Sequence, residues 1–210
     1  MSKPPPQVDR IARIKITLDH SKPVVWRRVE APLTTSLRGL HEVIQAAMLF
    51  ENYHLFDFTV QIEGEPCRYG IPDPDGGVDI ADAKNIKLGA LIDCGVKRLA
   101  YTYDFGDNWE HKLAIEAITD ADPAHEYPRF IEGERRAPPE DVGGIPGFED
   151  FIDAMMDLSH PERSRLIEWY GQTFKPEDIG IDQIKARITK LARRRTIGKA
   201  AFAKSRASKT

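Results

Sequence analysis

Cysteine is scarce in this sequence: only Cys67 and Cys94 occur among 210 residues. Two cysteines exclude a disulfide framework and are typical of free thiols in a reducing compartment. No apolar run approaches the ~18 residues that a membrane-spanning helix needs. The first residues, Met1–Gln7, also lack the apolar core of a signal peptide. We therefore expect a cytoplasmic protein that makes no contact with a membrane.

The common nucleotide motifs are also absent. No Gly-x-Gly-x-x-Gly follows an expected strand, and no Gly-x-x-x-x-Gly-Lys-Ser/Thr occurs. The sequence has no Gly-x-Ser-x-Gly elbow, no zinc-finger spacing and no aromatic-glycine motif of an RNA-recognition domain. Nucleotide-dependent chemistry therefore has no motif support, and a divalent metal is the cofactor that the side chains still allow.

Charge is distributed unevenly along the chain. The net charge is −3, but Lys185–Thr210 holds ten of the 30 Lys and Arg residues and none of the 33 acidic ones. The rest of the chain therefore carries −13. Such a polarity favours a polyanionic partner for the basic segment, or simple solvation of a frayed chain end. The candidate contacts to DNA or RNA are Arg193, Arg194, Arg195, Lys199 and Lys204.

Hydrophobic periodicity predicts an α+β fold, with strands first and helices last. An N-terminal hairpin is expected from strands at 14–18 and 24–29, followed by an amphipathic helix over 37–48 and a strand over 56–62. Two further strands, 98–104 and 109–118, enclose a tight turn. These strands form a central antiparallel sheet packed with several helices, and the C-terminal part is helical, with helices near 148–156, 159–170 and from 182 onward.

Three parts of the chain are distinguished by composition. Residues 1–7 are rich in proline and expected to be disordered, residues 8–192 form a single domain, and residues 193–210 form a basic, flexible tail. Residues 119–147 are rich in proline, glycine and charge and show no periodic pattern. A segment of that length inside a domain is typically functional or wrapped on the surface.

Several segments together resemble the plasmid pRiA4b ORF-3-like family, also labelled TnpR-type passenger proteins of insertion sequences. The most specific are Tyr101–His111 (YTYDFGDNWEH) and Ala137–Phe148 (APPEDVGGIPGF). Others are Pro23–Val29, Leu40–Met48, His54–Phe58, Trp169–Gly171 and Phe174–Glu177, so that the resemblance spans residues 10–190. It implies a mixed α+β fold, no settled activity and a mobile-element context. It does not imply recombination, because no activated serine with surrounding arginines stands near the first strand.

Acidic residues and a histidine gather around the turn between the two central strands. Asp104, Asp107 and His111 can bind a divalent metal or perform acid–base chemistry. By period two, however, Trp109 and His111 share the apolar face of their strand. His111 is therefore either a core histidine or a ligand, and the two aspartates could simply cap the turn.

A second acidic pair, Glu140 and Asp141, lies in the segment without periodicity. If this segment folds back over the turn, its carboxylates join Asp104 and His111, and His41 and His54 could complete a metal or hydrolytic pocket. The alternative is a rigid Pro-Pro elbow whose acids form ion pairs with neighbouring arginines. For His41, at the edge of the buried face of its helix, a buried hydrogen bond is the alternative role.

Two functions follow from these observations. The first is an accessory or binding protein of mobile-element context that contacts DNA, RNA or a protein partner. The second is a metal-dependent, hydrolase-like enzyme acting through Asp104, Asp107, His111, Glu140 and Asp141. Convergence of these side chains in one pocket favours the enzyme, and acids that all point into open solvent favour the binding protein. The sequence specifies neither a substrate nor an oligomeric state.

Overall fold

The computed structural model describes residues 9–72 and 80–207. Its strands are β1 (Arg10–Leu18), β2 (Trp26–Pro32), β3 (Phe56–Ile62), β4 (Glu65–Gly70), β5 (Ala81–Asp82), β6 (Arg98–Tyr103), β7 (Trp109–Asp120) and β8 (Arg129–Glu134). Its helices are α1 (Leu37–Met48), α2 (Leu88–Asp93), α3 (Gly144–Met156), α4 (Arg163–Tyr170) and α5 (Ile181–Ala207). The α+β fold predicted from the sequence is confirmed.

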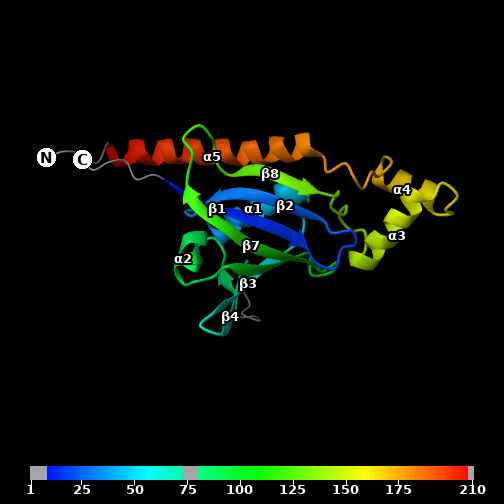
Figure 1. Ribbon diagram of the computed structural model, residues 1–210, viewed down its shortest axis with the longest axis horizontal. Coiled ribbons are helices and arrows are strands. Elements are labelled where there is room, and N and C mark those ends of the chain that lie inside the picture. The colour runs from blue at the N-terminus through cyan, green and yellow to red at the C-terminus, as the bar shows by residue number, and fades with distance from the viewer. Residues whose placement is uncertain (1–8, 73–79, 208–210) are drawn as a thin grey trace.

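All eight strands belong to one sheet, in the order β5-β4-β3-β6-β7-β1-β2-β8 (Figure 1). Neighbouring strands are antiparallel, except that β5 pairs with β4 in parallel. The predicted N-terminal hairpin is the β1–β2 pair, and the predicted central pair is β6–β7. The long strand β7 contacts both β6 and β1, and so joins the two halves of the sheet.

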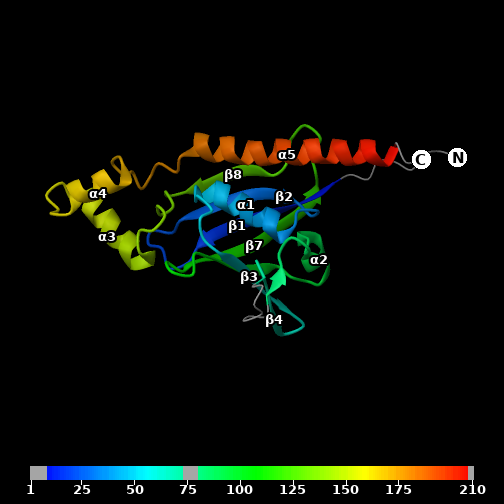
Figure 2. The ribbon, with the colours of Figure 1, turned by 180° about the vertical axis from the view of Figure 1, so that it is seen from behind.

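Helix α1 covers one face of the sheet and supplies much of the core. It begins after Ser36, whose hydroxyl accepts a hydrogen bond from the backbone N–H of Gly39. Its apolar residues recur at helical spacing and are buried against the sheet. Figure 2 shows α1 in front of the strands, with α5 running beside α1 and β8 along one side of the molecule. The opposite face of these strands has no helix over it in Figure 1.

Strand β8 lies inside the segment for which the sequence indicates no regular element. Only Phe130 in it is buried, and the charged residues around Phe130 hide the alternation. The strand exists because it pairs with β2 at the edge of the sheet. At Gly133 a Cβ atom would lie 2.6 Å from the Trp26 carbonyl oxygen, so this close approach of two strands requires glycine.

The C-terminal helices differ in part from expectation. A helix was expected near 159–170, but α4 begins at Arg163 and has no fully buried residue, and the Ser159 hydroxyl donates to Asp157 before the helix. The reason is its position at one end of the molecule, where it packs on α3 (Figure 1). Helix α5, expected from residue 182 onward, begins at Ile181 and buries Ile184 and Ile188.

Helix α5 continues through the boundary at which we expected a flexible tail. The basic segment is helical from residue 193 to Ala207. Residues 208–210 lie outside the described residues, and so does the segment 1–7 that we expected to be disordered. Over residues 9–72 and 80–207, no helix combines the length and the apolar character that crossing a bilayer demands.

Candidate metal centre

The turn between β6 and β7, Asp104–Asn108, is called the hairpin tip below, and its backbone fixes Asp104. This residue adopts left-handed backbone angles (φ 55°), and its N–H donates to the Leu55 carbonyl oxygen, 2.9 Å away. Asp104 Oδ1 accepts from the N–H of Gly106 at 2.9 Å. The carboxylate thus does cap the turn, but only Oδ1 is used, and Oδ2 faces His54.

Residues 137–144 lie against the hairpin tip. The N–H of Gly143 donates to Asp107 Oδ2 across 3.2 Å. At Gly144, which has a positive φ of 67°, a Cβ atom would lie 2.7 Å from the Asp107 carbonyl oxygen. Glycine is therefore required where the 137–144 segment meets the hairpin. This contact brings Glu140 and Asp141 beside Asp104.

Three carboxylates surround the imidazole of His54. Its Nε2 atom lies 3.1 Å from Asp141 Oδ1, 3.6 Å from Asp104 Oδ2 and 3.9 Å from Glu140 Oε2. These are ion-pair distances, and within the described residues Nε2 forms no hydrogen bond although it is shielded from solvent. Potential ligand atoms of His54, Asp104 and Asp141 all lie within 4.8 Å of one another.

Glu140 is the most enclosed acid of the segment that docks on the tip. Its Oε1 accepts from the N–H of Glu51 at 2.6 Å and from the hydroxyl of Tyr103 at 2.9 Å. Its Oε2 is buried and forms no hydrogen bond within the described residues. Burial raises the pKa of Glu140, and the two donors on Oε1 oppose the rise. Sequence reasoning missed Tyr103 as the partner of Glu140, because no local pattern joins positions 37 residues apart.

The donor set fits a divalent cation. Protein ligands bind zinc at about 2.0–2.2 Å, so the ligand atoms of one tetrahedral ion lie roughly 3.3–3.6 Å apart. The separations from Nε2 to Asp141 and Asp104, 3.1 and 3.6 Å, are close to that range. One imidazole with two or three carboxylates suits zinc or manganese, and three protein ligands leave positions open for water or substrate.

Two histidines predicted as candidates are placed elsewhere. His111 is buried on the core face of β7, where its Nδ1 bonds the Trp109 carbonyl oxygen at 2.9 Å. His41 is also buried, with Nδ1 joined to the Tyr101 hydroxyl at 2.8 Å and Nε2 to Asn52 Oδ1 at 2.6 Å. Burial lowers the pKa of both rings to about 4. Within the described residues, neither histidine belongs to a group of side chains that could bind a metal, so we exclude both from the candidate ligands.

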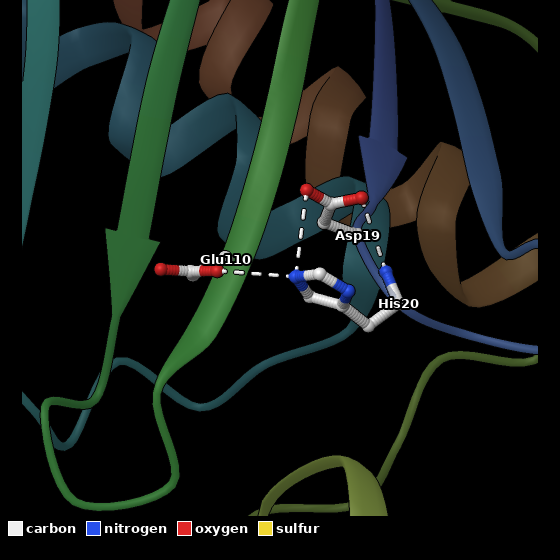
Figure 3. Close-up of side chains that lie close together, drawn as sticks. All are labelled: Asp19, His20 and Glu110. Carbon is white, nitrogen blue, oxygen red and sulfur yellow. Dashed lines mark hydrogen bonds and ion pairs between the residues drawn. The ribbon is translucent and has the colours of Figure 1, made fainter.

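A second group of potential ligands lies at the neighbouring end of β1. Figure 3 shows the His20 ring between Asp19 and Glu110. Its Nε2 atom lies 3.7 Å from the carboxylate of Asp19 and 3.5 Å from that of Glu110. The ring is largely exposed, and Asp19 already has a counter-charge in Lys112, whose Nζ is 2.6 Å away. The bond with Lys112 lowers the pKa of Asp19. This group is explained by ordinary surface ion pairs.

The five nucleic-acid candidates lie along α5 and are unequally available. Arg194 pairs with Glu42, and Arg195 and Lys199 both pair with Asp9. Within the described residues, Arg193 and Lys204 form no ion pair. Carboxylates of the acidic body therefore pair with three of the five candidates.

Comparison with known proteins places the chain in a family. The profile described as plasmid pRiA4b ORF-3-like protein matches residues 10–183. The uncharacterised protein y4hQ of Sinorhizobium fredii is 38% identical over 198 residues, which are 90% of this chain and all of that protein. A crystal structure of a protein of unknown function, MM3350 from Methanosarcina mazei Go1, is 33% identical with a TM-score of 0.75, covering 81% of this chain and 95% of that one. The chain belongs to the plasmid pRiA4b ORF-3-like family.

Proposed function

We propose that this protein binds a divalent cation at the hairpin tip through His54, Asp104 and Asp141, and that it is a metal-dependent, hydrolase-like enzyme. The observation that carries the proposal is the convergence of ligand atoms from three separate segments: the α1–β3 loop, the β6–β7 turn and the 137–144 segment. Because three carboxylates face one imidazole, a single imidazolium would leave the cluster negative, whereas a divalent cation balances most of its charge.

The chain's own residues have distinct parts in such a site. His54 and Asp104 are held by the hairpin and the loop beside it, and Asp141 is more exposed and faces the solvent side. Glu140 Oε2 lies beside His54 without a hydrogen bond, and burial raises the pKa of this carboxyl group. A higher pKa makes a carboxylate a stronger base. We assign Glu140 the role of proton acceptor. A bound metal would supply Lewis acidity and an activated water molecule.

The accessory role in a mobile-element context stays a prediction, as does contact with DNA or RNA through α5. The relatives named above are described as uncharacterised or of unknown function, so they indicate no activity for this chain. The ion pairs of Arg194, Arg195 and Lys199 with body carboxylates reduce the charge that α5 could offer to phosphates. The convergence at the hairpin tip therefore makes the metal-dependent enzyme the better supported function.

Metal analysis of the purified protein, followed by calorimetric titration of the chelator-treated protein with Zn²⁺ and Mn²⁺, tests the binding step. We expect one ion per chain and at least about tenfold weaker binding in Asp104→Asn and in His54→Gln, because each removes a ligand. Asp93→Asn, at the exposed end of α2, is the matched control and should bind as the wild type does. Equal affinity in all four proteins, or no binding, contradicts the proposal.

The catalytic step needs a separate assay. Hydrolysis of 4-nitrophenyl phosphate and 4-nitrophenyl acetate should require the metal, and Glu140→Gln should lower kcat while one ion still binds. Circular dichroism identifies variants that fail to fold. If the metal-bound wild type hydrolyses neither substrate, the proposed enzymatic activity is wrong and only the proposed metal binding remains.

A further inference from the structure

A groove of about 980 Å³ lies between α1 and α5. Figure 2 shows the ribbons of these two helices side by side. The groove is lined by α1, by the loop that follows α1 and by the middle of α5, and we call it the α1–α5 groove. Its residues from α1 and the loop include Glu42, Ala46 and Phe50, and those from α5 include Lys190 and Leu191. The groove shares the α1–β3 loop with the candidate metal centre, because the N–H of Glu51 donates to Glu140, but binding in the groove requires no metal.

The wall of the groove is largely apolar. Ala46, Phe50 and Leu191 contribute to it, and at the far end Ile197 is 69% exposed. A large aliphatic side chain that is exposed beside a groove is typical of a surface that another apolar surface covers. Within the described residues, no element of this chain covers Ile197.

The charges around the groove are predominantly positive. Both of its acidic residues are engaged, Glu42 with Arg194 and Glu51 with Arg187. Lys185, Lys190 and Arg193 also line the groove and form no ion pair within the described residues. The groove therefore presents three uncompensated cations beside an apolar wall, on a chain whose remainder is strongly acidic.

We propose that the α1–α5 groove binds an acidic amphipathic helix of a protein partner. Two helices that lie side by side form the trough in which an amphipathic helix places its apolar face, and acidic residues along its edges complement the free lysines and arginine. Nucleic acid is the less fitting occupant, because a phosphate backbone satisfies the cations but leaves the apolar wall and Ile197 uncovered.

Fluorescence anisotropy with a synthetic probe tests this proposal on the full chain. The probe is a 15-residue labelled peptide with leucine at helical spacing on one face and glutamate elsewhere. We expect saturable binding, and at least tenfold weaker binding of a scrambled peptide of the same composition. Ile197→Asp and the triple variant Lys185→Glu, Lys190→Glu, Arg193→Glu should each weaken binding at least tenfold. Both alter exposed side chains, so folding should be retained.

The matched control is the triple variant Lys87→Glu, Lys97→Glu, Arg98→Glu, which makes the same change in net charge at exposed positions away from the groove. It should bind the probe as tightly as the wild type. Equal binding of the ordered and scrambled peptides, or an equal loss in the two triple variants, overturns the proposal in favour of unspecific charge attraction. Tighter binding of a labelled 15-nucleotide strand that Ile197→Asp leaves unchanged overturns it in favour of nucleic acid. Concentration-dependent dimers abolished by Ile197→Asp overturn it in favour of a second copy of this chain.

Discussion

The hydroxyl group of Tyr103 in β6 donates a hydrogen bond to Glu140 Oε1, 2.9 Å away, and so connects the sheet to the 137–144 segment. The same oxygen of Tyr103 accepts from the N–H of Tyr53 at 3.0 Å, in the loop that carries His54. One phenol group therefore contacts two of the three segments that form the candidate metal centre. Burial, followed by the bond to Glu140, raises the pKa of Tyr103, so it remains a donor at any physiological pH.

Tyr103→Phe is expected to lower the free energy of unfolding by about 1–2 kcal/mol, because Glu140 loses one donor and the Tyr53 N–H loses its acceptor. Metal affinity should fall as well, since the 137–144 segment is held less firmly. Urea denaturation and calorimetric titration measure the two effects. Tyr53→Phe is the control, because that side chain is exposed. Equal effects of the two substitutions contradict the connecting role of Tyr103.

The raised pKa of Glu140 makes a prediction about pH. An acid whose folded-state pKa exceeds its unfolded value, near 4.5, ionises more easily in the unfolded chain. The wild type should therefore lose stability relative to Glu140→Gln as the pH rises from about 4.5 through the raised value, and the difference should then stay constant. Urea denaturation in the presence of a chelator, from about pH 3.5 to about pH 8, measures it. Glu149 is exposed, so the unfolding free energy of Glu149→Gln should change with pH as that of the wild type does. If the difference in unfolding free energy between the wild type and Glu140→Gln is the same at every pH, the pKa of Glu140 is not raised.

Local patterns predicted the elements that bury a continuous apolar face. Helix α1 and the pair β6–β7 were predicted because their periodicity is regular, and the core-facing position of His111 follows from the same period of two. Strand β8 was missed because a short edge strand with one buried side chain has too little alternation to detect. Tertiary pairing with β2, rather than its own sequence, creates it.

The candidate site was predictable by residue type but not by arrangement. Asp104, Glu140 and Asp141 were candidates because acids in a turn and in a proline-rich loop can bind metal. Their convergence on His54, rather than on His111, depends on how the 137–144 segment docks on the hairpin tip. That docking rests on the close approach of Gly144 to Asp107, which no periodicity reports.

The buried ring of His41 predicts a loss of stability in acid. Burial lowers its pKa from 6.5 to about 4, so the unfolded chain binds the proton first as the pH falls. Stability should be lost between pH 6.5 and about 4, by up to about 3 kcal/mol for this group. A ring that accepts from the Tyr101 hydroxyl cannot keep that bond when protonated. NMR titration of the ring should give a midpoint near 4, and the unfolding free energy of His41→Gln should vary less with pH over this interval. If the unfolding free energies of the wild type and of His41→Gln change with pH in the same way, the pKa of His41 is not lowered in the folded protein.

The guanidinium of Arg27 is fully buried and, within the described residues, has no carboxylate partner. Three backbone carbonyl groups accept hydrogen bonds from Nε and Nη1, whereas Nη2 forms none with the described residues. Its Nε donates to Ala47 at 2.9 Å, near the C-terminal end of α1, and Nη1 donates to Trp26 and Glu134 at 2.8 Å. Burial lowers the pKa of Arg27 to about 10, which still leaves it charged at neutral pH. The negative end of the helix dipole favours a cation at this position.

Arg27→Met should therefore lower the free energy of unfolding by about 3 kcal/mol, because three carbonyl groups lose a charged donor while the apolar volume is nearly conserved. Arg38→Met, an exposed position on α1, is the control and should change it by less than about 0.5 kcal/mol. Urea denaturation measures the unfolding free energies of the two variants. A stability for Arg27→Met equal to that of the control means that water replaces the lost donors.

Gly144→Ala tests the docking of the 137–144 segment most directly. The added methyl group would meet the Asp107 carbonyl oxygen at 2.7 Å, and the φ of 67° is unfavourable for alanine, so the segment must shift away from the hairpin tip. We expect a loss of about 1–3 kcal/mol in unfolding free energy and a larger proportional loss of metal affinity, because Asp141 moves with the segment. Gly198→Ala is the matched control: its Cβ meets nothing within 4 Å, and alanine in the interior of α5 should raise stability by about 0.5–1 kcal/mol. If Gly144→Ala keeps full metal affinity, the position of Asp141 does not depend on this contact.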